Sequence, residues 1–416
     1  MDHTAYVKPA GAARPIQKPR PLQLGFDVPM VLVVVSLTVI GLLMVYSASW
    51  NYTLRNGESA SYILNRQIMW ALVGGALAAL LTFINYHYYQ RLVVPAMAVT
   101  MVLLLAVLFI NDNNTGPTRT LFNGSIQPSE LAKLTIIIYL SAWLYSKRDV
   151  LSNISFGLLP IMVILGITAG LILLEPDLSA AATVIMLGGL LFFLANGELR
   201  QIVLVLVVVC LLGALVVNIS DTGRQRFTDY VMGLQSPEDA SYHVRRSMEA
   251  VVRGGVFGVG IGKGTTKFTG LPVPWTDSIF AVIVEETGLL GGTVIILLYL
   301  FFLWRGLKIA QRAPDMLGKL LAAGVTLWVA LEALINIGVM VNVIPFAGNA
   351  LPFMSAGGSN MVTTLAGIGI LLSVSRSSIA EKSATEGRSF GAVIDLRGRD
   401  RRRGVSRGNR SAGSRR

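Results

Sequence analysis

The strongest constraint in this chain is a series of long apolar segments that contain almost no charge. The first of them, Val28–Trp50, has no charged residue, and about 20 apolar residues are enough to cross the hydrocarbon core of a bilayer. Charged residues make up only 14% of the chain, whereas a soluble domain has about 25%. The sequence therefore excludes an ordinary soluble globule and predicts an all-α polytopic membrane protein.

Similar apolar runs recur along the chain, and we expect each to form one transmembrane helix, about ten in all. They lie at residues 28–49, 67–84, 92–110, 130–146, 156–174, 178–195, 200–218, 278–304, 320–344 and 354–375. The longest segment between them, 219–277, contains three prolines and a glycine cluster. We expect it to be a large loop with one amphipathic helix near Tyr242–Arg253.

The positive charge of the chain is concentrated at its two ends. Of a net charge of +12, residues 1–26 contribute +3 and residues 376–416 contribute +8. Short loops rich in Lys and Arg stay in the cytoplasm, which predicts that both termini are cytoplasmic and that 219–277 is extracellular. We therefore expect a basic N-terminal tail (1–26), a membrane domain (27–375) and a disordered basic C-terminal tail (376–416).

Several classes of protein and site are excluded by composition. The tails almost lack aromatic residues, so we expect no binding to nucleic acid. Cys210 is the only cysteine, and the three histidines are far apart in the sequence, which excludes a disulfide framework and a cysteine- or histidine-based metal site. The first apolar run is too long for a signal peptide and should remain as a membrane anchor.

A glycine run at Gly254–Gly264 suggests a phosphate-binding loop but does not meet the requirements of one. A Walker A sequence needs Ser or Thr after Gly-Lys, and here Gly264 follows Lys263. A tightly turned or flexible loop is one interpretation. Direct contact of Lys263 or Lys267 with an anion such as a lipid diphosphate is the other.

Ionisable residues inside the apolar runs are candidates for function because their burial is costly. Glu130 and Lys133 are three residues apart, so they share a helix face and either fix helix packing or face a substrate groove. Glu285 and Glu286 are adjacent, so at most one of them can face any given partner squarely. Further candidates are Glu175 and Asp177 at a tight turn, solvated or facing a polar cavity, and Glu332, for which a packing hydrogen bond is expected.

Asp277 differs from these carboxylates because it lies where the extracellular loop meets the next predicted helix. Either Thr276 or Asp277 caps that helix, or the Asp277 carboxylate faces a cavity at the membrane surface and accepts a proton. The segment Gly348–Ser359 contains Pro352 and paired glycines just before the last helix. It is either a simple turn or a re-entrant element that lines a cavity.

Together these pieces resemble the shape, elongation, division and sporulation (SEDS) family, more closely its FtsW division branch than its RodA elongation branch. The resemblance runs from about Val28 to Ser375. The matching pieces are Gln127–Lys133, Glu175–Leu178, Gly254–Gly264, Thr276-Asp277, Ile279–Ala281, Glu285-Glu286, Asn336–Gly338, Leu351–Phe353, Ser355 and Gly357–Ser359. Departures from the family pattern are Trp275 for His, Ser278 for Phe, Ala356 for Tyr, Asn360 for Ser, and Arg119-Thr120 for an Arg-Trp pair.

The resemblance implies a ten-helix fold with both termini cytoplasmic. It also implies an enzyme, a peptidoglycan glycosyltransferase that polymerises lipid II on the outer face of the bacterial cytoplasmic membrane, with a class B penicillin-binding protein and other division or elongation proteins as partners. The septum is the expected location. Whether the role is in division or elongation stays open at this point.

The resemblance also points to site residues. Asp277 is the expected general base, which takes a proton from the acceptor sugar hydroxyl. Residues expected to contact the substrate are Glu130, Lys133, Lys263, Lys267, Glu285, Glu286, Ser355 and Ser359. Positive charge is needed at the departing diphosphate; Lys263, Lys267, Arg245, Arg246 and a divalent cation, Mg²⁺ or Mn²⁺, are candidates for it.

Two other functions fit the same residues. A bundle of helices with inward-facing charges also suits a transporter that moves lipid II across the membrane. A non-catalytic scaffold of the division machinery is the other alternative, favoured if the departures from the family pattern disable the site. A scaffold tolerates the loss of Asp277, whereas the enzyme does not.

Overall fold

The computed structural model describes residues 25–110, 120–121, 126–151, 153, 157–198 and 221–399, with isolated positions between 200 and 218. These residues form the helices α1 (Val28–Arg55), α2 (Tyr62–Phe83), α3 (Tyr89–Ile110), α4 (Pro128–Ser146), α5 (Leu159–Leu174), α6 (Leu178–Leu194), α8 (Asp221–Gln235), α9 (Tyr242–Gly254), α10 (Ile279–Gln311), α11 (Met316–Met340) and α12 (Gly358–Arg399). Within the described residues, strand-like pairing is limited to one bridge between Leu121 and Ile126.

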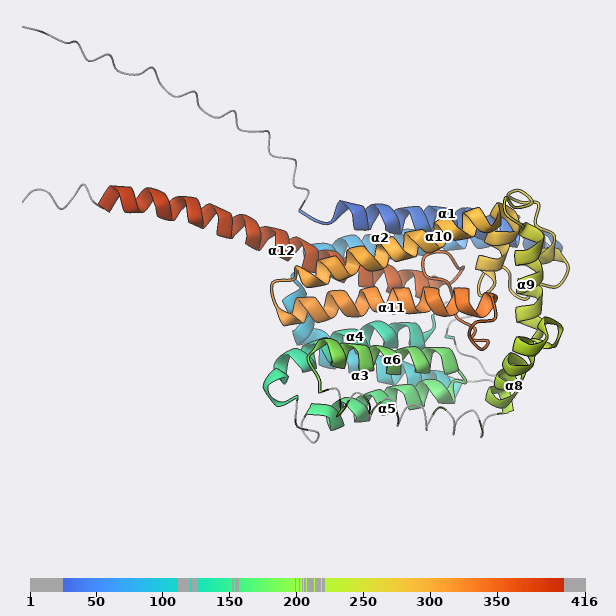
Figure 1. Ribbon diagram of the computed structural model, residues 1–416, viewed down its shortest axis with the longest axis horizontal. Helices are drawn as coiled ribbons and strands as arrows, with labels where there is room; N and C mark the ends of the chain where they lie inside the picture. Colours follow the sequence, from blue (N-terminus) through green and yellow to red (C-terminus); the bar gives the residue numbers. More distant parts are fainter. Residues whose placement is uncertain are drawn as a thin grey trace, which may run out of the picture.

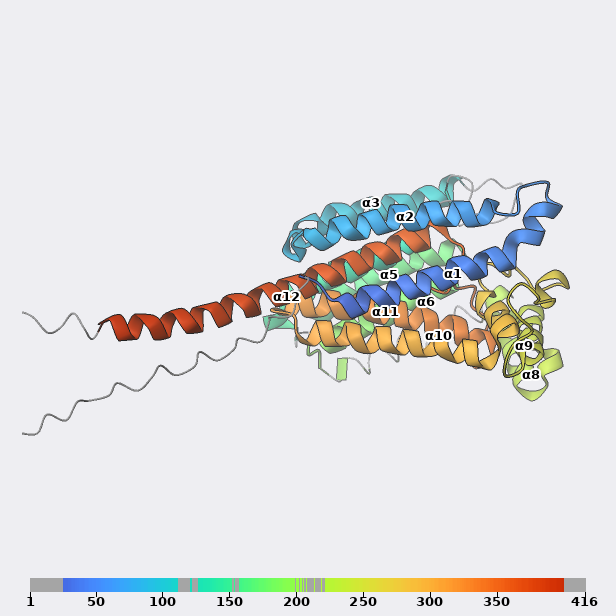
Figure 2. The same cartoon turned by 90° about the horizontal axis from the view of Figure 1, so that it is seen from above.

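The helices α1–α6 and α10–α12 lie side by side in one bundle, and α8 and α9 cover one end of it (Figure 1). We call this the loop end, since it carries residues 221–278. At the opposite end, the tail end, α1 begins and α12 projects beyond the bundle (Figures 1 and 2). The beginning of the first helix and the end of the last one thus lie on the same side of the molecule.

The described helices match the apolar runs that the sequence predicts. Six of them, α1, α2, α3, α10, α11 and the first part of α12, are long and apolar enough to cross a membrane, and α5 and α6 are shorter apolar helices. Helix α4 covers the predicted run 130–146. The run 200–218 lies mostly outside the described residues. The protein is therefore an all-helical polytopic membrane protein, while the count of ten spans stays a prediction.

The loop segment and the C-terminal tail are more helical than the sequence predicts. The amphipathic helix expected near Tyr242–Arg253 is confirmed as α9, but α8 precedes it and was not expected. Helix α12 continues to Arg399, whereas the sequence predicts a disordered tail from residue 376 onward. Residues 376–399 contain no proline and many good helix formers such as Ala, Glu and Arg, which allows the last helix to continue.

The core of the bundle lies around α4 and α11. Ile136, Ile137 and Leu140 of α4 are fully buried, as are Leu321 and Trp328 of α11. The outer helices instead expose large apolar side chains, such as Leu72 of α2. Since lipid tails are as apolar as leucine, this surface suits a bilayer. Two buried charge networks, that of Glu130 with Lys133 and that of Lys267 with Glu286, lie within this core or at its edge and are described below.

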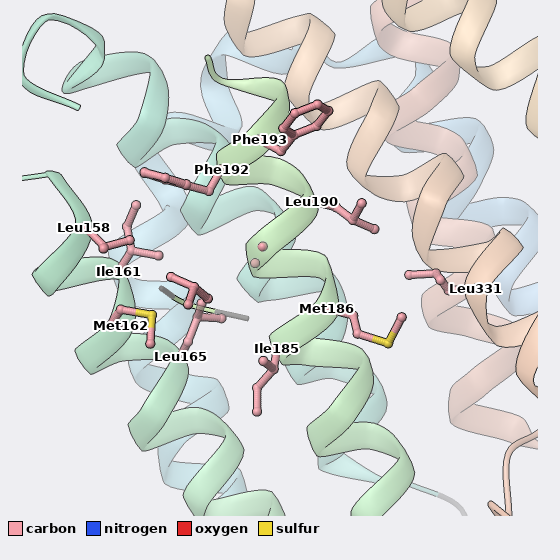
Figure 3. A pocket seen from close by; sticks show the side chains of 13 residues that line it. Leu158, Ile161, Met162, Leu165, Ile185, Met186, Leu190, Phe192, Phe193 and Leu331 are labelled. Atoms are coloured by element: carbon pink, nitrogen blue, oxygen red, sulfur yellow. The ribbon is translucent and has the colours of Figure 1, made fainter. Parts of the chain in front are cut away.

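The apolar cavity in Figure 3 lies away from the loop end. It has a volume of about 390 Å³, and its walls come mainly from α5 and α6, with Leu331 of α11. Its residues lie in the first half of α5 (Ile161, Leu165) and the second half of α6 (Met186, Phe193), which is the half of both helices nearer the tail end. The cavity is therefore not part of the polar site at the loop end.

Candidate active site

Asp277 lies in a turn directly before α10, at the loop end. The helix begins at Ile279 and its N-cap residue is Ser278, whose side chain makes no capping hydrogen bond. The interpretation of Thr276 or Asp277 as the N-cap is therefore not supported. The Asp277 side chain is half-buried, and a Cβ added at Gly348 would lie 3.1 Å from its Oδ2. The carboxylate thus borders the Gly348–Ser359 segment and keeps access to the surface.

The turn is held by the backbone carbonyl groups of Trp275–Asp277. The three oxygens accept hydrogen bonds from Ala356 N at 2.8 Å, from Ser355 Oγ at 2.7 Å and from Asn336 Nδ2 at 2.9 Å. Three successive carbonyls are thereby bonded to α11 and to the segment before α12. Such bracing holds a reactive group in one geometry, which proton transfer requires.

Ser355 therefore has an internal role in this structure. It is buried, its hydroxyl accepts a hydrogen bond from Leu351 N at 2.8 Å, and it donates to the carbonyl of Thr276. Its own carbonyl accepts a hydrogen bond from Gln67 Nε2 of α2 at 3.0 Å. The Gly348–Ser359 segment thus connects α2 to the Asp277 turn, and contact of Ser355 with substrate stays a prediction.

His243 of α9 supports the turn from the other side. Its Nε2 is bonded to Ser278 Oγ, and that hydroxyl donates to the carbonyl of Pro272 at 2.8 Å, so the imidazole is the donor. The ring packs on Phe346 with 4.5 Å between ring centroids. Burial lowers the pKa of His243 to about 4, because a buried charge is poorly solvated. The neutral ring therefore links α9 to the start of α10 at neutral pH.

Glu130 and Lys133 form a buried charge network between α4, α11 and α12. Lys133 Nζ donates to Glu130 Oε1 at 2.8 Å and also pairs with Glu332. Asn360 Nδ2 donates to Glu130 Oε2 at 2.9 Å. Glu332, expected to make a packing hydrogen bond, is instead an ion-pair partner. Two carboxylates share one ammonium here, so the network has one excess negative charge when all three groups are ionised.

A second set of polar contacts lies beside this network. Asp177 caps α6 by accepting a hydrogen bond from Ala180 N, and its Oδ2 accepts one from Gln127 Nε2 at 3.0 Å. The backbone N–H of Gln127 donates to Ser359 Oγ at 3.2 Å. Asp177 is 3% exposed, so the solvated alternative for this residue is wrong. Ser359 is placed at the junction of α4 and α12, near Glu130.

Three further charged residues predicted from the sequence, Lys267, Glu285 and Glu286, form a separate group. Together with Ser47 we call this group the loop-base cluster. Lys267 Nζ and Glu286 Oε1 are 2.5 Å apart, and both side chains are fully buried. Ser47 of α1 donates to Glu286 at 2.7 Å. Glu285 accepts from the backbone N–H groups of Thr265 and Thr266. These contacts attach the glycine run to α10, so the structure gives the three charged residues an internal role.

The glycine run is a tightly turned loop whose shape requires glycine. Gly258 and Gly288 both have positive φ angles, and a Cβ added at Gly258 would lie 2.3 Å from the carbonyl oxygen of Glu286. No other residue permits so close an approach of the two backbones. These backbone angles and contacts confirm the interpretation of the glycine run as a tightly turned loop. Lys263 is exposed on it, so among the predicted lysines only Lys263 can reach a ligand without breaking a buried pair.

Two small pockets flank Trp275, two residues before Asp277. One, of about 250 Å³, is lined by Tyr52, Arg55 and Phe268 among others. The other, of about 180 Å³, is lined by Arg66 and Trp70 among others. Tyr52 packs on Trp275 with 4.4 Å between ring centroids. Each pocket thus combines aromatic surface with one arginine, as binding of a sugar and an anionic group requires.

The described part of the chain contains no cluster of side chains that would hold a metal ion by itself. No group of three or more His, Cys, Asp or Glu residues lies close enough there to hold a metal ion. Mg²⁺ is usually held by one or two carboxylates together with substrate phosphates, so participation of Mg²⁺ or Mn²⁺ stays a prediction. Among the described residues, Arg55 and Arg66 contribute positive charge to the two pockets beside Trp275.

Sequence reasoning missed several of the residues that build this site. Arg55 and Arg66 lie at the ends of apolar helices, where an arginine is normal. Asn336 stood out only as part of a piece that matches the family, and Asn360 only as a departure from the family pattern. The one usable signal was that a polar residue inside a membrane helix needs a partner. Which partner it finds depends on contacts across more than 50 residues of sequence, as between Asn336 and Asp277.

Comparison with known proteins gives this geometry its context. The model of the FtsW/RodA/SpoVE family, described as "Cell cycle protein", matches residues 28–380. The chain belongs to this family. The "Probable peptidoglycan glycosyltransferase FtsW" of Trichlorobacter lovleyi is 36% identical over 365 residues, covering 84% of this chain and 93% of the relative. "Stage V sporulation protein E" of Bacillus subtilis is 33% identical over 355 residues, covering 84% and 97%.

Solved structures of the family share the fold. A structure described as "Structural coordination of polymerization and crosslinking by a peptidoglycan synthase complex" aligns with a TM-score of 0.69 and 25% identity, over 85% of this chain and 99% of that one. The rod shape determining protein RodA of Thermus thermophilus aligns with a TM-score of 0.63 and 24% identity, over 86% and 99%. Family membership and the SEDS resemblance therefore agree.

Proposed function

We propose that this protein is a peptidoglycan glycosyltransferase that polymerises lipid II into glycan strands on the outer face of the cytoplasmic membrane. Support comes from relatives named as peptidoglycan glycosyltransferases and from the Asp277 turn. The observation that carries the proposal is a half-buried carboxylate on a turn held at three successive carbonyls. In this role Asp277 takes the proton from the attacking sugar hydroxyl.

The pockets on either side of Trp275 are the places for the polar part of the substrate. Arg55 and Arg66 line them, and guanidinium groups stabilise a departing diphosphate through paired N–H donors. Lys263 adds exposed positive charge on the glycine run. The topology that this needs, with the loop end outside and both tails in the cytoplasm, is supported by the distribution of Lys and Arg in the loops.

A class B penicillin-binding protein is the proposed partner and the division septum the proposed location. A similar chain occurs in a solved peptidoglycan synthase complex, and the first relatives carry the division name FtsW. The basic tail end of the protein suits an anionic cytoplasmic leaflet.

The test is a polymerisation assay in detergent, where no membrane separates two compartments. The purified protein is incubated with lipid II and the class B partner, and products are resolved by length on a gel. An enzyme gives a ladder of glycan strands, whereas a transporter gives no polymer. A scaffold also gives no polymer in this mixture; when a separate polymerase is added, it gives a ladder that does not change when Asp277 is replaced by Asn.

A further inference from the structure

The end of α9 and the glycine run together expose a set of apolar side chains. Phe257 is 80% exposed and Val252 is 78% exposed. With Val256, Val259 and Ile261, which are also exposed, they form what we call the apolar knob. A water-exposed patch of this kind is unfavourable and usually marks a contact surface.

The knob is rigid, so its exposure is not that of a loosely packed loop. The backbone N–H groups of Val259 and Gly260 donate to the carbonyls of Glu285 and Glu286, each at 3.0 Å. In return, Leu289 and Leu290 N–H groups donate to Gly255 and Val256. These bonds fix the loop against residues 285–290 of α10. The position of the knob along the bundle axis therefore follows from the position of these α10 residues.

Two contacts between α1 and α10 mark the edges of the hydrocarbon layer. At the tail end, Arg305 pairs with Asp27 at 2.8 Å; toward the loop end, Ser47 bonds Glu286 at 2.7 Å. Twenty residues separate Asp27 from Ser47, and nineteen separate Glu286 from Arg305. At 1.5 Å per residue the α1 stretch spans about 30 Å, the thickness of a bilayer core, and the α10 stretch, which is helical except at Gly288, spans nearly as much. Glu286 therefore lies at one boundary of that core.

The knob lies at this same boundary. Gly262 N donates to Glu286 Oε2 at 2.9 Å, and the other end of the loop is bonded to Leu290, one turn deeper. Leu289 and Leu290 are more than half exposed, as is Val294 on the next turn, so this surface of α10 faces lipid. The exposed apolar side chains of the loop continue the lipid-facing surface of the helix. In the sequence, Arg253 and Lys263 flank most of the knob; Lys263 is exposed, and Arg253 also pairs with Glu249 at 2.8 Å.

We propose that the apolar knob inserts into the bilayer interface beside α10, with Phe257 among the acyl chains and Arg253 and Lys263 at the anionic headgroups. A Phe ring and aliphatic side chains suit this layer, and neighbouring basic residues add attraction to anionic lipids. The bilayer, not a second protein, is the occupant because the patch lies at the core boundary and is continuous with a lipid-facing helix. The inference does not depend on the reaction that the protein catalyses.

The test uses a fluorophore placed on the knob. In a Cys210→Ala background, Phe257→Cys is labelled with an NBD dye and the protein is reconstituted in vesicles of phosphatidylcholine and phosphatidylglycerol. Part of the phosphatidylcholine carries a doxyl quencher near the top of its acyl chain. Leu290→Cys is the lipid-facing control and Glu238→Cys, exposed on the loop end, is the solvent control. Val256→Cys repeats the measurement if the first variant folds poorly.

We expect quenching at position 257 to be at least half of that at position 290 and several-fold stronger than at position 238. Red-shifted emission without quenching, as at position 238, would place the knob in water and overturn the proposal. Blue-shifted emission without quenching would overturn it too, because the knob would then be covered by protein, either a second copy or a partner.

Discussion

The Asp277 turn and the loop-base cluster lie at the same end of the bundle and use charged residues in opposite ways. In the cluster, Lys267 and Glu286 are fully buried and neutralise each other. In the turn, three successive backbone carbonyls are bonded and the Asp277 carboxylate stays half-buried beside Gly348. This comparison shows that a charged residue near the membrane surface is not by itself a functional one: the buried pair stabilises a loop, whereas the half-buried Asp277 carboxylate is the group that we propose for chemistry.

The largest effect that would separate the two regions is expected from Asp277→Asn. The amide keeps the shape of the side chain but cannot act as a base, and loss of a general base costs about 10² to 10⁴ in rate. We expect the variant to insert and unfold like the wild type but to give no visible polymer from lipid II on a gel. Asp149→Asn, at an exposed tail-end position, is the matched control and should polymerise normally.

The next largest effect is expected on stability, from Lys267→Met. This change leaves the Glu286 carboxylate buried without its cation, and breaking a buried pair costs about 3–5 kcal/mol. We expect a lower thermal midpoint in detergent and faster protease cleavage within residues 254–270. Lys263→Met, on the same loop but exposed, should change neither. If Lys267→Met were as stable as the wild type, the loop-base cluster would not hold the glycine run.

A smaller effect is expected from Arg55→Gln, which tests whether the pocket beside Trp275 belongs to the Asp277 region. Loss of a hydrogen bond to a charged group costs about 1.5–3 kcal/mol, so we expect the KM for lipid II to rise on the order of tenfold or more. The thermal midpoint should not change. Arg148→Gln at the tail end serves as control, and equal KM values for both variants would remove this pocket from the site.

The smallest effect concerns pH and the contact of His243 with Ser278. The folded-state pKa of His243 is about 4 and the unfolded value is about 6.5, so between pH 6.5 and pH 4 the unfolded form takes up the proton more readily than the folded form. The contribution of this residue to stability is therefore constant above pH 6.5 and declines as the pH falls from 6.5 to 4. Hydrogen exchange of α9 should increase over that range, and His243→Phe should remove this pH dependence.

The helical bundle could be predicted from the sequence because long apolar runs can cross a bilayer only as helices or closed barrels. The positions of α1, α2, α3 and α9 follow from local pattern alone. Helix α8 could not be predicted in this way. Its residues are mostly polar, and it is held by contacts with distant segments, such as Tyr230 Oη with the carbonyl of Val343 at 3.0 Å.

The candidate site was predicted in part, for a similar physical reason. Asp277, Glu130 and Lys133 were recognisable because a charge beside or within an apolar run is costly. Sequence could not distinguish the accessible carboxylate of Asp277 from the buried one of Glu286, since burial is set by the partners that folding brings close. Ser47 lies 239 positions before Glu286, and no local pattern connects the two.

The most direct test of this account measures polymerisation rate and thermal midpoint on the same preparations of Asp277→Asn and Glu286→Gln. We predict that Asp277→Asn loses polymer formation and keeps its midpoint, whereas Glu286→Gln has a lower midpoint and keeps part of its rate per folded molecule. Strand synthesis by Asp277→Asn at the wild-type rate would contradict the account, and so would a parallel loss of rate and stability in both variants.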